Sequence, residues 1–161
     1  MNERLRSEVR LSKTHIFNAK HKTKIGTWNV RTLYQDGRLE QLLREMKKYN
    51  LDILGISEMR WTGQGKITSE DTTILYAGKE DHHSSGVGIL LNKEAAQALE
   101  GWKPVNDRII MARLQSRHAK RHNRQQIEMT HGQCIALSEN LQGLHHAMQA
   151  YLLRTKMASD Y

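Results

Sequence analysis

The stretch of residues 24–61 (KIGTWNVRTLYQDGRLEQLLREMKKYNLDILGISEMRW) constrains the fold most, because it predicts a strand, a helix and a second strand in succession. The first strand ends at Asn29, and the second, the nearly continuous apolar run 51–56, is followed by Glu58. Between them, Gly37 opens a helix that Asn50 can end. The apolar residues of this helix are spaced by three and four positions, as on one buried face: Leu39, Leu42, Leu43 and Met46.

Two strands joined by one helix form a right-handed crossover in which the strands are parallel. Ligands of open α/β sheets gather at the carboxyl ends of such strands, so Asn29 and Glu58 are predicted to share one sheet edge. The residue types alone leave two interpretations open. An Asn after a strand is commonly a turn residue and a Glu there is commonly solvated, whereas an amide and a carboxylate together can also hold a metal ion and a phosphate.

Three segments carry a family resemblance: WNVRTL (28–33), ILGISEMRW (53–61) and SSGVGILLNK (84–93). Together they resemble the N-terminal half of the endonuclease/exonuclease/phosphatase family, most closely the endonuclease domains of RTE-type non-LTR retrotransposons. The resemblance covers about residues 22–120. It implies an α/β fold, namely a partial α/β sandwich made of the first sheet with its flanking helices. It also implies that the Glu58 carboxylate binds a catalytic Mg²⁺ and that Asn29 helps to position the active-site carboxylate and phosphate.

Charge and composition agree with a nucleic-acid partner. The 161-residue chain has a net charge of +8 and a pI near 9.7, which favours a polyanion, and the resemblance implies DNA. Its one cysteine, Cys134, excludes an internal disulfide framework. No apolar run approaches the ~18 residues of a membrane helix. We therefore expect an intracellular protein with no membrane segment, and favour the nucleus over the cytoplasm.

The segment after the second strand is predicted to be a loop, residues 62–71, which borders the DNA-binding face in this family. Candidate DNA contacts are Arg31, Arg60, Trp61 and Lys66. An equally open alternative is a plain surface loop with Trp61 packed beneath it. The adjacent His82 and His83 would point in opposite directions along an extended chain, so we expect them to be solvated and not to chelate a metal.

Further elements follow from the local pattern. Strands are predicted at 72–77 and 86–91, and Asn92 is expected to cap a short helix over 93–99. The segment from Gly101 to Pro104 is expected to break that helix. Residues 108–115 are predicted to form a strand that closes the first sheet.

The two ends of the chain lie outside the resemblance. Residues 1–22 are predicted to be a disordered basic leader, with a DNA-contacting arm as the alternative. Residues 121–161 contain none of the family's Gly-Asp-Phe-Asn or Ser-Asp-His segments. An apolar stripe there predicts a partly helical tail, and its residues are Leu137, Leu141, Leu144, Met148 and Leu152. Three interpretations of this stripe remain open: it docks on the sheet, it binds another protein, or its spacing is accidental.

The functional expectation is a truncated Mg²⁺-dependent DNA endonuclease of retrotransposon origin. It would be catalytically impaired, because the resemblance places the Asp/Asn pair and the essential His of such enzymes in segments that this sequence lacks. Glu58 alone would bind Mg²⁺ weakly. We also expect only the first sheet to be present, with its inner apolar face bare unless the C-terminal helix or a partner covers it. The alternative is a non-catalytic basic fragment that binds nucleic acid or a protein.

Overall fold

The computed structural model describes residues 23–118, 121–130 and 133–138. The predicted leader 1–22 lies outside these residues, as does most of the predicted helical stripe. The first crossover forms as expected. Strand β1 (Ile25–Asn29) lies parallel to β2 (Ile53–Ser57), with Asn29 in register with Ser57, and helix α1 (Arg38–Lys48) joins them. Asn50 takes a left-handed conformation (φ 51°) just after α1, which confirms it as the residue that ends the helix.

The first sheet has five strands in the order β1-β2-β5-β4-β3. Strands β4 (Thr72–Ala77) and β5 (Val87–Leu91) confirm two predicted elements, and β5 pairs antiparallel with β2. The prediction of a loop over 62–71 is wrong, because β3 (Gln64–Ser69) forms a hairpin with β4. The residues of β3 are mostly polar and exposed, so the sequence gives no apolar pattern of a strand there. At the edge of the sheet, β3 is hydrogen-bonded to β4 alone.

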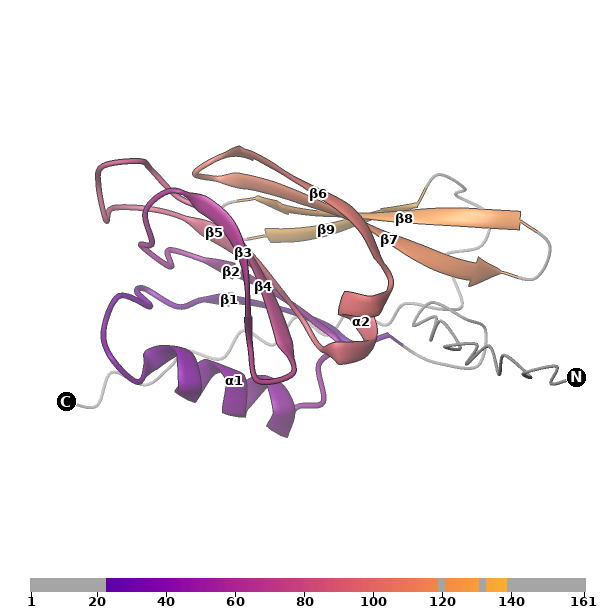
Figure 1. Ribbon diagram of the computed structural model, residues 1–161, viewed down its shortest axis with the longest axis horizontal. Coiled ribbons are helices and arrows are strands. Elements are labelled where there is room, and N and C mark those ends of the chain that lie inside the picture. The colour runs from indigo at the N-terminus through magenta and orange to yellow at the C-terminus, as the bar shows by residue number, and fades with distance from the viewer. Residues whose placement is uncertain (1–22, 119–120, 131–132, 139–161) are drawn as a thin grey trace, which may run out of the picture.

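A second sheet lies face to face with the first, which overturns the expectation of a bare inner face (Figure 1). It contains β6 (Leu99–Asn106), β7 (Ile109–His118), β8 (Arg121–Thr130) and β9 (Gln133–Ser138), each antiparallel to the next. Residues 108–115 therefore belong to this sheet and not to the first one. The segment from Gly101 to Pro104 does not end the preceding helix as predicted, because that helix ends at Gln97 and residues 101–104 lie in the middle of β6.

The apolar residues explain the three layers. On β2, alternate side chains face opposite ways: Ile53 packs between the two sheets, whereas Leu54 and Ile56 pack against α1. The core between the sheets receives Ile110, Ala112 and Leu114 from β7, and Ile127 and Met129 from β8. Helix α1 covers the other face of the first sheet with Leu42, Leu43 and Met46, as its periodicity predicted (Figure 1).

The C-terminal segment corrects a second expectation. Leu137, the first residue of the predicted helical stripe, lies in β9 and is in register with Gln126 of β8. The remaining stripe residues lie outside the described part of the chain. Strands β8 and β9 extend the second sheet, because β8 pairs with β7 and β9 pairs with β8, and this pairing supplies hydrogen bonds that local propensity does not predict.

A buried polar network fixes the end of the sandwich opposite to Asn29. The Asp52 carboxylate accepts hydrogen bonds from the Lys24 backbone N–H (2.8 Å) and from Asn92 Nδ2 (2.9 Å). Asn92 Oδ1 in turn accepts from the Ala95 N–H and caps the short helix α2 (Lys93–Gln97), as the sequence predicted. One carboxylate thus connects the start of β1, the start of β2 and the end of β5.

Candidate functional site

Asn29 and Glu58 lie at the carboxyl edge of the parallel pair β1 and β2, as predicted. Asn29 is exposed at the end of β1, and Glu58, half-buried, follows Ser57 directly. The Asn29 side-chain oxygen accepts a hydrogen bond from the Arg31 backbone N–H (3.0 Å). This bond uses the amide oxygen as the acceptor and leaves donation to the amide nitrogen, which suits a neighbouring carboxylate or phosphate.

The backbone at this edge is strained. Among the described residues, five that are not glycine have positive φ, and three of them lie here: Arg31 (57°), Glu58 (57°) and Arg60 (59°). Left-handed conformations cost such residues roughly 1–2 kcal/mol and concentrate where a structure presents functional side chains. The fully buried Met59 between Glu58 and Arg60 anchors this strained segment in the core.

Hydrogen bonds hold three loops together around this segment. The Leu33 N–H donates to the Met59 carbonyl (2.9 Å), and the Met59 N–H donates to the Gly86 carbonyl (3.3 Å). The loop after β1 and the loop before β5 therefore lie on either side of the segment that carries Glu58. We call this group of loops (residues 29–36, 58–63 and 78–86) the Glu58 edge.

The candidate DNA contacts divide into two groups. Arg31 and Arg60 are exposed at the Glu58 edge, and Lys66 is exposed on the edge strand β3. Trp61 favours the packed alternative: its indole N–H donates to the Leu33 carbonyl (3.2 Å) and its ring meets Tyr76 edge to face, with centroids 5.2 Å apart. Trp61 therefore has a structural role in the Glu58 edge, whereas Arg31, Arg60 and Lys66 are solvent-exposed positive charges.

A metal ion here would depend on few protein ligands. Within the described residues, no three His, Cys, Asp or Glu side chains gather in a way that could hold a metal. Mg²⁺ commonly uses one or two carboxylates and completes its shell with water and substrate phosphate, so Glu58 fits such a site. The hydroxyl of Ser57, the residue before Glu58, is fully buried and has no hydrogen-bond partner among the described residues.

The sequence did not indicate a contact that joins the two sheets near this edge. Ser85 Oγ, beside Gly86, donates a hydrogen bond to Asp107 Oδ2 (2.5 Å) in the turn between β6 and β7. This bond holds the pKa of Asp107 below its ordinary value of 3.8, with further help from the positive charges of Lys79 and Arg108. Nothing in the local sequence pairs residues 22 positions apart, so only a folded structure reveals the contact.

Replacing Ser85 with alanine is expected to destabilise the protein in a pH-dependent way. Because the pKa of Asp107 is lower in the folded state, the ionised carboxylate stabilises the folded state at pH values above the unfolded-state pKa of about 4. This stabilisation is lost as the pH falls through the folded-state pKa of Asp107. Ser85→Ala should cost about 1 kcal/mol at pH 7, and the difference from the unmodified protein should shrink below about pH 4. Urea unfolding at several pH values measures this. The exposed neighbour Ser84, changed to alanine, is the control, and an equal loss at pH 3 and pH 7 would contradict the assignment.

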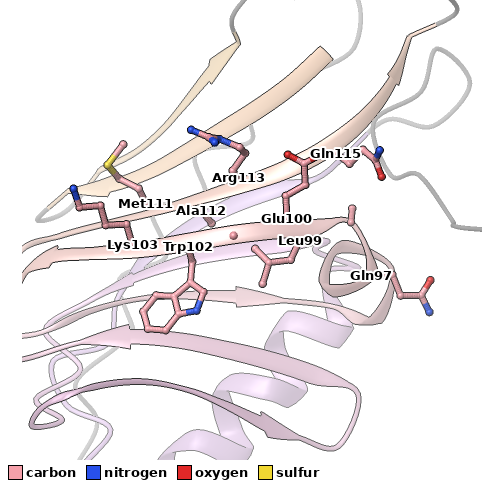
Figure 2. A pocket seen from close by; sticks show the side chains of 11 residues that line it. Gln97, Leu99, Glu100, Trp102, Lys103, Met111, Ala112, Arg113 and Gln115 are labelled. Carbon is pink, nitrogen blue, oxygen red and sulfur yellow. The ribbon is translucent and has the colours of Figure 1, made fainter. Parts of the chain in front are cut away.

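An open hollow lies elsewhere, along the β6–β7 hairpin next to α2 (Figure 2). Trp102 points toward the first sheet, and Lys103, Met111 and Arg113 extend on the opposite side of the hairpin. The hollow begins at Gln97 and Leu99, at the end of the sandwich opposite to the Glu58 edge. Its lining includes the Glu100 carboxylate and the amides of Gln97 and Gln115, but none of the residues that the family resemblance singles out.

Comparisons with known proteins identify relatives of the chain. No known family model matches it. Within the described residues, no helix is long and apolar enough to cross a membrane. The chain is 43% identical over 93 residues to craniofacial development protein 2 of Bos taurus, and equally so to that of Tragulus javanicus. The matched segment is 58% of this chain and only 16% of either relative, so the chain is similar to a limited part of craniofacial development protein 2.

Proposed function

We propose that the chain derives from a Mg²⁺-dependent DNA endonuclease of the endonuclease/exonuclease/phosphatase family, of retrotransposon origin, and that these 161 residues bind DNA but cleave it poorly. The observation that carries the proposal is the placement of Asn29 and Glu58 at one edge of the parallel pair β1 and β2. The segments that resemble the family, the strained backbone around Glu58 and the net charge of +8 support it.

The residues at the edge suit binding of a phosphodiester better than its hydrolysis. Glu58 would hold a hydrated Mg²⁺, which when bound supplies positive charge to a phosphate oxygen. Asn29, whose amide oxygen accepts from the Arg31 N–H, would donate to a phosphate from its amide nitrogen, and the exposed Arg31 and Arg60 add positive charge at the rim. Hydrolysis also needs a group that positions and deprotonates water, and losing such a group commonly costs about 10²–10⁴-fold in rate. The Gly-Asp-Phe-Asn and Ser-Asp-His segments that supply these groups in the family do not occur in the sequence.

The proposal predicts DNA binding that depends on Mg²⁺ through Glu58. With a fluorescein-labelled duplex and low salt, binding in Mg²⁺ should exceed binding in EDTA by about fivefold, which corresponds to about 1 kcal/mol. Glu58→Gln should abolish that difference. Glu94→Gln, an exposed carboxylate on α2 at the opposite end, should preserve it. Affinity should also fall steeply with salt, since bound phosphates release counterions.

A supercoiled-plasmid assay separates binding from cleavage. We expect little or no Mg²⁺-dependent nicking by the unmodified chain. Robust nicking that Glu58→Gln abolishes would show a competent nuclease and overturn the claim of impairment. Absence of DNA binding even at low salt would reject the proposed function as a whole.

A further inference from the structure

Tyr34 is the most exposed large apolar side chain of the described residues, at 66%, compared with 47% for Val105 and 38% for Ile67. It is nevertheless held in place. Its backbone N–H donates to Thr32 Oγ1 (3.1 Å), and its ring lies against the His83 ring, with centroids 4.4 Å apart and the planes tilted by 47°. An aromatic ring that is ordered by a neighbour yet open to solvent can receive a flat ligand with little loss of conformational entropy.

His83 is anchored by a second contact. Its Nδ1 lies 2.8 Å from the Arg60 carbonyl oxygen. A carbonyl only accepts hydrogen bonds, so Nδ1 carries the proton and the ring orientation is set. The sequence predicted only a solvated histidine here, and the structure adds these two contacts to an exposed side chain. Tyr34 and His83 thus form an aromatic platform that connects the loop after β1 with the loop before β5.

The platform adjoins the candidate metal ligand. Arg60, whose carbonyl anchors His83, lies two residues after Glu58, and Leu33, next to Tyr34, is bonded to Met59. Arg31 and Arg60 present exposed guanidinium groups on the same loops. A DNA strand with one phosphate at Glu58 would therefore bring a neighbouring base within reach of the platform. Its next phosphates would lie near the positive charges of Arg31 and Arg60.

We propose that Tyr34 and His83 stack on an unpaired base of the DNA, so that the Glu58 edge selects single-stranded or locally opened DNA over continuous duplex. This inference rests on the proposed function. Bases of an intact duplex already have both faces stacked, so a ring platform favours a base that has left the helix. Stacking is also tolerant of sequence, since every base has a π face.

The test uses the full chain, a fluorescein-labelled single-stranded oligonucleotide and its blunt duplex, in Mg²⁺ and low salt. Tyr34→Ala should lower the affinity for the single strand about tenfold, which is the effect expected from losing one base–aromatic stack. It should lower the affinity for the duplex much less. Tyr34→Phe, which retains the ring, should bind as the unmodified protein does. Val105→Ala, an exposed apolar residue on β6, is the matched control and should leave both affinities unchanged.

A second readout reports stacking itself. An oligonucleotide containing 2-aminopurine should lose fluorescence on binding to the unmodified protein and to Tyr34→Phe, but less so on binding to Tyr34→Ala at saturation. If the unmodified protein binds DNA and Tyr34→Ala matches it in affinity and quenching, the stacking inference is wrong while the proposed function stands. If the unmodified protein binds neither oligonucleotide, both are wrong.

Discussion

Ile127→Asp is expected to unfold the sandwich. Ile127 lies on β8, is fully buried and packs between the two sheets with residues of the first sheet such as Ile53 and Ile89. A carboxylate there would lose its hydration without a partner, and the lost apolar contacts add to the cost. The total should exceed about 5 kcal/mol, which is comparable to the whole stability of a typical domain. Circular dichroism and thermal unfolding measure the loss.

Val105→Asp is the control for that substitution. It introduces the same carboxylate on β6 of the same sheet, at a side chain that is 47% exposed, so its effect should stay within about 0.5 kcal/mol. If Ile127→Asp unfolds at the same temperature as Val105→Asp, then β8 does not cover the first sheet.

The opening crossover could be predicted because its signals are local and redundant. Leu42, Leu43 and Met46 follow the helical period, Asn50 ends the helix, and the apolar β2 has the composition of a strand covered on both faces. Asn92 was predicted as a cap for the same reason, since its hydrogen bond to Ala95 spans three residues. Each of these features depends on interactions within about one turn or one strand.

The second sheet could not be predicted, because its strands depend on their partners. In β8 (RHNRQQIEMT), Ile127 and Met129 are the only apolar residues of the strand's sequence, and both pack between the sheets. Two apolar residues do not distinguish a strand from a loop. The leucine stripe that begins at Leu137 was a stronger local signal, yet Leu137 pairs in a strand because β8 offers it hydrogen bonds.

The candidate site likewise has features that the sequence predicts and features that only the folded structure reveals. Asn29 and Glu58 could be placed together because strand ends in a parallel pair share an edge. The contacts that shape the edge, Tyr34 with His83 and Ser85 with Asp107, join loops from different parts of the chain. An aromatic residue in a loop beside a predicted site residue was the one signal in the sequence that could have drawn attention to Tyr34.

Gly78→Ala is expected to be the most damaging of the small substitutions near the site. A β-carbon on Gly78 would collide with the Trp61 carbonyl oxygen, a backbone atom that cannot rotate away. Hydrogen bonds hold the two segments together at this point: the Gly78 N–H donates to the Gly63 carbonyl (2.7 Å), and the Gly63 N–H donates to the Lys79 carbonyl (2.9 Å). Relief of the collision therefore requires the 61–63 backbone to move away from β4, at a cost of about 3 kcal/mol.

This substitution also connects the stability of the fold to the Glu58 edge. Because Trp61 follows Arg60 directly and bonds to Leu33, a displaced 61–63 segment should disturb both Arg60 and the loop that carries Tyr34. We expect Tm to fall by roughly 10–20 °C and DNA affinity to drop at temperatures where the protein is still folded. Gly101→Ala is the matched control, since a β-carbon on Gly101 meets nothing within 4 Å. If both glycine variants unfold at the same temperature, the close approach of β4 to Trp61 does not exist, and the edge must owe its shape to other contacts.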